Sequence, residues 1–129
     1  MPKGVLLGVV TEVGLPDGLD TLAAFSDGGV RYINTSAKMV IVEGRIEDTN
    51  TAVLKLFTVA QDAVNRLKPL TGARWAPPAK GTVRFTFLTS EGLYLGQGPL
   101  SAMQRDQMGA PILQAATDLL LIMVKLGTK

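Results

Sequence analysis

The segment YLGQGPLSAMQRD, residues 94–106, contains residue types that could bind a phosphate group. Gly96 and Gly98 flank a single residue, and a short helix is predicted to begin near Ala102. A phosphate site needs backbone N–H groups that converge at the N-terminus of a helix, where the helix dipole favours an anion. On this hypothesis the candidate ligand-binding residues are Gly96, Gln97, Gly98, Ser101 and Arg105.

The same segment also has a purely structural explanation. Its G-x-G-P pattern lacks the third glycine of the dinucleotide-binding fingerprint and the Lys-Ser/Thr pair of the P-loop. Pro99 removes one N–H donor. Ser101 and Gln104 fit a capping box, in which side chains satisfy free N–H groups of the first helical turn. The pattern favours a joint between a strand and a helix. A small-molecule or nucleotide site that also uses residues 27–31 is the alternative.

A second candidate surface is the stretch between Asp62 and Glu91, which contains basic residues and no acidic one. A tryptophan beside cations can stack on the bases of single-stranded nucleic acid. The charges are dispersed, however, and no RRM, KH or helix-turn-helix signature accompanies them. A solvated loop whose tryptophan packs into a groove is the ordinary explanation. The functional hypothesis is an anionic or unidentified protein partner, with weak RNA or single-stranded DNA binding as a further alternative. The candidate partner-binding residues are Arg74, Trp75, Lys80 and Arg84.

Catalytic and metal-binding chemistry has little support in the composition. The chain contains no cysteine and no histidine. This excludes disulfides and thiolate catalysis, and removes the most frequent general base and metal ligand. Asp17 and Asp20 lie at a predicted turn, and Glu47 and Asp48 lie where a helix dipole favours negative charge. We therefore expect a non-enzymatic protein without a metal site or cofactor.

The overall composition indicates one domain, residues 1–129. Hydrophobic residues make up 47% of the chain and charged residues 19%, and the net charge is +2. The mean hydropathy of +0.25 is high for a globular protein. The most apolar run, Leu119–Val124, lies in a helix predicted over 111–126, which is shorter than the about 20 residues that span a bilayer. We expect a soluble, cytoplasmic protein that does not enter a membrane.

Alternating apolar residues and turn signals predict two groups of strands that flank one helix. The first group is a strand over 5–13, a hairpin over 21–34 that turns at 27–29, and a strand over 39–43. A second hairpin is predicted over 82–98, with its turn at Glu91-Gly92. We expect the short helix near Ala102 and the helix over 111–126 to follow it.

The first helix is predicted over 49–68, with Asp48 or Thr49 as its N-cap and Pro69 ending it. An apolar stripe with helical spacing supports it, formed by Val53, Leu56, Phe57, Ala60, Ala63, Val64 and Leu67.

The resulting order is ββββ-α-ββ-α-α, which predicts an α+β fold with one antiparallel sheet of about six strands and two main helices packed on it. Over residues 20–126 this order loosely resembles the topology of profilin-like and roadblock-like folds. The resemblance is one of topology, since no motif of those families is present and their strand count differs.

The last helix motivates the main functional hypothesis. Its polar residues are confined to four positions: Gln114, Thr117, Asp118 and Lys125. We expect such a helix to be buried on more than one face or to meet its copy in a dimer. Asp118 would then need a partner, for which Arg31 and Arg84 are candidates. The sequence thus favours a non-enzymatic interaction or scaffold module that forms a homodimer.

Overall fold

The computed structural model describes residues 5–16, 18–34, 38–44, 46–66 and 79–127. Strands β1 to β4 precede the first helix and strands β5 and β6 follow it. Their bounds are β1 Leu6–Leu15, β2 Gly18–Phe25, β3 Val30–Ile33, β4 Met39–Val42, β5 Thr82–Thr89 and β6 Gly92–Pro99. The helices are α1 Glu47–Val64, α2 Leu100–Met103 and α3 Gly109–Gly127.

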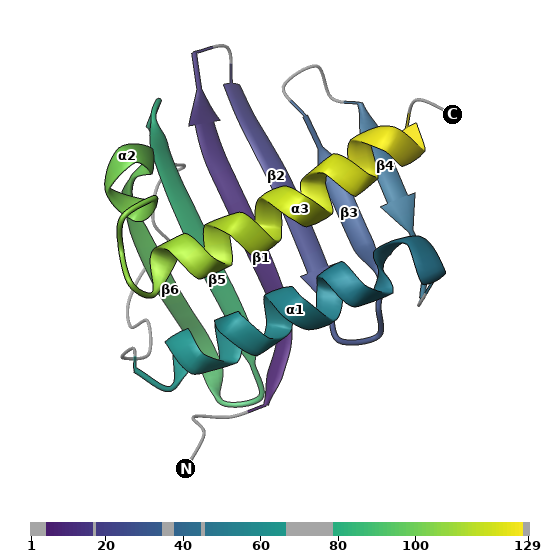
Figure 1. The fold of residues 1–129 in the computed structure, drawn as a ribbon, viewed down its shortest axis with the longest axis horizontal. Coiled ribbons are helices and arrows are strands. Elements are labelled where there is room, and N and C mark those ends of the chain that lie inside the picture. Colours follow the sequence, from purple (N-terminus) through teal and green to yellow (C-terminus); the bar gives the residue numbers. More distant parts are fainter. Residues whose placement is uncertain (1–4, 17, 35–37, 45, 67–78, 128–129) are drawn as a thin grey trace.

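The six strands form one sheet in the order β4-β3-β2-β1-β5-β6, and every neighbouring pair is antiparallel. Helices α1 and α3 lie side by side across the same face of this sheet, and α2 lies beside the end of β6 (Figure 1). The predicted α+β architecture is confirmed. Among the described residues, no helix or strand covers the opposite face of the sheet.

The core lies between the sheet and the two long helices. In the central strands, Val9 pairs with Phe87 and Thr11 pairs with Phe85, and all four side chains are buried. Successive residues of a strand point to opposite faces, so these alternating positions form one helix-facing surface. The helices complete the core with fully buried side chains: Leu56, Ile112, Leu119 and Met123.

Helix α1 begins and ends earlier than predicted. Its N-cap is Ile46, without a side-chain cap hydrogen bond, so the prediction of Asp48 or Thr49 as the cap is wrong. The carbonyl of Ile46 accepts from the N–H of Asn50, which places both predicted caps inside the first turn. The helix ends at Val64, where the N–H groups of the next residues fold back onto α1 carbonyls.

The start of α3 also differs from the prediction. Ser101 lies inside the short helix α2, which has no side-chain cap, so the capping-box prediction is wrong. The residue that caps α3 is Asp106, whose Oδ2 accepts from the N–H groups of Met108 at 3.0 Å and Gly109 at 2.6 Å. An aspartate satisfies free N–H groups well at this position, so α3 begins before Pro111.

Helix α3 is less buried than its composition predicts. Its 19 residues are long and apolar enough to cross a membrane by length and composition alone, and 33% of its most apolar window is buried in the domain. Leu119 and Met123 lie in the core, whereas Leu121 is 59% exposed and Val124 is 42% exposed. Within one chain the outward side of α3 is therefore not buried, and its burial against a second copy stays a prediction.

Candidate functional site

Gly96 and Gly98 lie within strand β6 and not in a turn. The register pairs Gly96 with Phe85 and Gly98 with Val83, so both glycines face the helices. A Cβ atom built at Gly96 would meet no atom within 4 Å. The preceding helix-facing position, Tyr94, is occupied by a large side chain that is 2% exposed. The alternation in β6 therefore fills one core position and leaves the next two without side chains.

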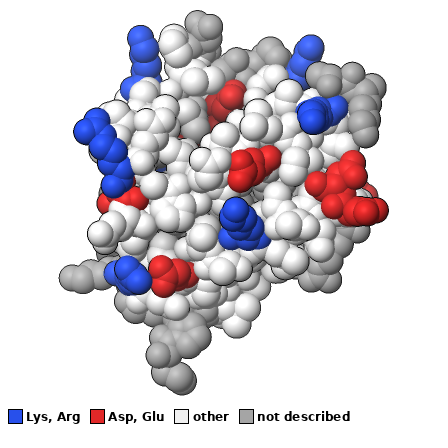
Figure 2. All heavy atoms as spheres, viewed as in Figure 1, with Lys and Arg blue, Asp and Glu red and all other residues white. Residues whose placement is uncertain are grey.

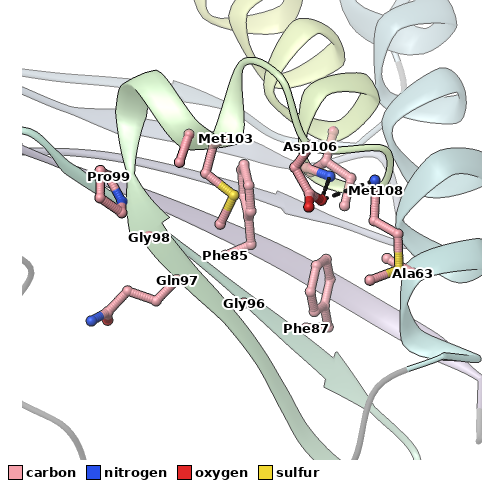
Figure 3. A pocket seen from close by; sticks show the side chains of 13 residues that line it. Ala63, Phe85, Phe87, Gly96, Gln97, Gly98, Pro99, Met103, Asp106 and Met108 are labelled. Carbon is pink, nitrogen blue, oxygen red and sulfur yellow. Dashed lines mark hydrogen bonds between the residues drawn. The ribbon is translucent and has the colours of Figure 1, made fainter.

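A cavity of about 340 Å³ opens at these glycines (Figure 3). Its floor is made of Phe85, Phe87 and Ile112, which are only 1–2% exposed and belong to the core. Met103 of α2 and Met108, just before α3, supply two of its walls. The cavity thus runs from the molecular surface down to the main hydrophobic core.

Asp106 is the charged residue among the described side chains that line this cavity. Its Oδ2 accepts the N–H groups of Met108 and Gly109, and its backbone carbonyl accepts that of Ala110. Pro111 has no N–H to offer. The first donors of α3 are therefore already bonded, and a carboxylate occupies the place where a phosphate would bind.

The structure brings together part of the predicted ligand-binding set. Gly96, Gln97 and Gly98 line the cavity, whereas Ser101 and Arg105 are exposed and do not. The Gln97 side chain points away from the cavity, so this residue contributes its backbone (Figure 3). Sequence reasoning missed the two methionines and Asp106. The sequence did contain a signal for the cavity. In the alternation Tyr-x-Gly-x-Gly of β6, the residues at the helix-facing positions are Tyr94, Gly96 and Gly98, and the two glycines have no side chain.

The expectation that residues 27–31 share a site with the 94–101 segment is wrong. These residues join β2 to β3, and strands β2, β1 and β5 separate β3 from β6. The two segments therefore lie apart across the width of the sheet (Figure 1).

The predicted basic surface is only partly described. Arg74 and Trp75 lie outside the described residues, and Lys80 is exposed. Arg84 is only 6% exposed. Its Nε donates to Oε1 of Gln97 at 2.7 Å, and its Nη1 lies 3.8 Å from Oε1 of Glu12. Arg84 therefore bonds neighbouring strands and is not presented to solvent as a nucleic-acid-binding cation.

The predicted ion pair of Asp118 with Arg84 or Arg31 is not formed. Asp118 accepts instead from Nε2 of Gln114, one turn earlier on α3, at 2.9 Å. Arg31 points to the face of the sheet opposite the helices, because its neighbour Tyr32 faces them. A short hydrogen bond along one helix face thus replaces the expected contact across the sheet.

No protein family model matches this chain, and no curated protein or solved structure matches it either.

The free edge of the sheet at β4 is the second feature of interest. A groove of about 770 Å³ runs between this edge and the C-terminal end of α3. Three large apolar side chains around it are exposed, namely Met39 at 52%, Ile41 at 49% and Val124 at 42%. Such a cluster on a small domain is typical of an interaction surface.

The backbone of β4 is unpaired on its outer side within the described part of the chain. The N–H of Asn34 donates to the carbonyl of Lys38, which makes these two a hydrogen-bonded pair. Such pairs alternate along an antiparallel ladder, so Val40 and Val42 bond β3. The N–H and C=O groups of Met39 and Ile41 therefore point outward.

Over the helix-bearing face, acidic and basic side chains are interspersed among uncharged ones, and no patch of one sign extends across it (Figure 2). Within the described residues, no group of three or more acidic side chains could hold a metal ion. Tyr32 donates its hydroxyl hydrogen to Oδ2 of Asp20 at 3.1 Å. Burial, and then the charge of Asp20, raise the pKa of Tyr32, so this phenol stays neutral at physiological pH.

Proposed function

We propose that this protein is a small non-enzymatic interaction module that self-associates through the edge strand β4. The observation that supports the proposal best is the unpaired edge of β4 with exposed apolar side chains on both sides of it. Met39 and Ile41 lie on the face opposite the helices, and Val124 lies on the helix side. A second strand could therefore gain backbone hydrogen bonds and bury apolar surface in one contact.

Charged residues and prolines are two features that protect exposed edges in monomeric proteins. The strand Met39–Val42 reads MVIV and contains neither, although it is short and Lys38 and Glu43 flank it. This favours pairing with another strand over exposure to water.

A second copy of the chain is the occupant that symmetry favours. Most soluble homo-oligomers are two-fold dimers in which the same patch meets itself. Antiparallel pairing about an axis near Val40 would place Met39 of each copy opposite Ile41 of the other. Both residues have outward-pointing backbone groups, so this register forms hydrogen bonds and apolar cross-strand contacts together.

The same proposal describes a cytoplasmic protein without catalytic activity. The absence of cysteine and histidine agrees with a chain that needs neither disulfides nor the commonest catalytic bases. The packing of α3 against α1 and the sheet supports a role for this apolar helix as a layer of the domain.

Size-exclusion chromatography with light scattering tests the proposal. We expect a dimer for the unmodified protein and a monomer for Ile41→Lys, because a charged side chain at the edge opposes strand pairing. The matched control is Leu93→Lys, which alters a similarly exposed residue, 41% against 49%, on the other edge strand. It should remain a dimer.

Two results would contradict this function. One is a monomeric wild-type protein throughout the micromolar range, which would leave the β4 edge without a second copy. The other is a monomer produced by Leu93→Lys and not by Ile41→Lys, which would move the interface to β6. Circular dichroism melts of both variants establish that each is folded.

A further inference from the structure

We propose that the cavity beside β6 is a binding site for a small apolar molecule that carries a positively charged group. The site lies at the opposite edge of the sheet from β4, so this inference does not depend on self-association.

The depth of the cavity favours a small molecule over a flat protein contact. Its rim residues Gln97, Pro99 and Asp106 are exposed, whereas its floor residues Phe85 and Ile112 are almost completely buried. The volume of about 340 Å³ lies at the lower end of the range for small-molecule sites, about 300–1,000 Å³. A compact ligand that reaches the core would therefore fit this shape.

The residues that line the cavity favour a ligand with a large apolar group. Phe85 and Phe87 present two aromatic rings whose centroids lie 6.4 Å apart and whose planes are inclined by 30°. Met103 and Met108 add flexible thioethers that adapt to irregular shapes and contact aromatic rings favourably. Contact with these groups favours an aromatic or branched aliphatic group over a polar one.

Two features keep the cavity open. Gly96 has no side chain, and nothing lies within 4 Å of where its Cβ would be. The terminal methyl of Met103 lies 3.7 Å from the corresponding Cβ position at Gly98, so it contacts the strand without filling the space over Gly96. The empty volume is thus a consequence of residue choice in β6.

The negative charge of Asp106 at the rim of the cavity favours a ligand with a positively charged group. Asp106 is exposed, and only its Oδ2 is engaged in the two hydrogen bonds that cap α3. Arg105 does not line the cavity, so its guanidinium does not supply an opposing charge inside the lining. A ligand ammonium group is therefore attracted to this rim and a carboxylate is repelled.

Three probes of matched shape separate these contributions: 2-phenylethylammonium, 2-phenylethanol and phenylacetate. Each is titrated into isotope-labelled protein, and the amide shifts of Gly96, Gly98 and Met108 are followed by NMR. We expect saturable binding that is tightest for the ammonium, weaker for the alcohol and weakest for phenylacetate.

Asp106→Asn tests the charge while keeping an oxygen that can cap α3. This change should weaken ammonium binding about two- to fivefold, as expected for an exposed ion pair, and leave the alcohol unchanged. Gly96→Leu places a side chain in the cavity and should abolish binding of all three probes. Leu93→Ala, which alters the opposite face of the same strand, should bind them as the wild type does.

The proposal is overturned if none of the probes gives saturable shifts. It is also overturned if phenylacetate binds as tightly as the ammonium, or if Gly96→Leu binds the ammonium normally. An unchanged ammonium affinity in folded Asp106→Asn would remove the assigned role of the carboxylate.

Discussion

The two edge strands of the sheet differ in where they expose apolar groups. In β4 these groups lie on the face opposite the helices, and in β6 they line a cavity on the helix-facing side. At β4 the helix-facing position Val40 carries a side chain, and α3 approaches it so closely that a Cβ at Gly127 would lie 2.6 Å from Val40. The outward positions Met39 and Ile41 are exposed and apolar. At β6 the helix-facing positions Gly96 and Gly98 leave a cavity. The outward Gln97 joins a polar row with Arg84.

This difference shows how residue alternation decides the use of an edge strand. Large apolar residues at both alternate positions produce a strand with side chains toward the helices and an exposed apolar outer face, as at β4. Glycine at the inward positions produces an edge with an accessible interior, as at β6. The first arrangement suits strand pairing and the second suits ligand binding. Three stability measurements test whether the two edge strands differ in this way.

The largest effect is expected from Phe85→Ala, which enlarges the cavity at the β6 edge. Phe85 is 1% exposed and forms part of the cavity floor. Removing a buried aromatic ring should lower the free energy of unfolding by about 3–5 kcal/mol. Denaturant unfolding measures the loss. Leu54→Ala, at a position 56% exposed, is the control and should change it by less than about 0.5 kcal/mol.

A loss below about 1 kcal/mol for Phe85→Ala would mean that the β6 end collapses around the missing ring. The cavity would then be a soft region of packing and not a maintained space.

An intermediate effect is expected from Tyr32→Phe in β3, which pairs with β4. This change removes the hydrogen bond to Asp20 and should cost about 1 kcal/mol at neutral pH. It should also reduce the loss of folding stability that occurs as the pH becomes alkaline. The pKa of Tyr32 is raised in the folded protein by burial and by Asp20, whereas the unfolded phenol titrates near about 10.

The sign of this pH effect follows from proton linkage. Between the unfolded and folded pKa values the unfolded state loses its proton first, so wild-type stability falls as the pH rises above about 10. The Tyr32→Phe variant lacks this contribution, so its free energy of unfolding should decrease less steeply over the same pH range. Urea unfolding at several alkaline pH values measures the difference. Parallel curves for the two proteins would show that Tyr32 is not linked to folding.

The smallest effect, and the one of opposite sign, is expected from Gly96→Leu. The position has open space and lies in a strand interior, where glycine is unfavourable by about 0.5–1 kcal/mol. Unfolding should therefore require more denaturant. A clear destabilisation would show that the cavity does not accept a side chain from β6.

Local patterns predicted most of the fold. The hairpin turn at residues 27–29 and the turn at Glu91-Gly92 were confirmed, because their glycines adopt positive φ values, 93° at Gly28 and 122° at Gly92. The helical stripe from Val53 to Val64 was also confirmed, since its spacing directs one face toward the sheet.

The caps and charge partners were not predictable in the same way. Asp106 and Ser101 are both suitable cap residues, and the path of the chain between α2 and α3 selected Asp106. Arg84 reads as part of a basic segment along the chain. Strand pairing placed it between Gln97 and Glu12, which are distant in sequence.

Most of the secondary structure, the antiparallel α+β class and the absence of thiol and imidazole chemistry could be read from the sequence alone. These properties depend on composition, on periods of two and of three to four residues, and on local turn geometry. Only the packed structure shows that the two glycines of β6 face a cavity, that Arg84 is buried, and that β4 is the end strand of the described sheet. Those properties depend on register and strand order, which are set by contacts between residues far apart in the chain.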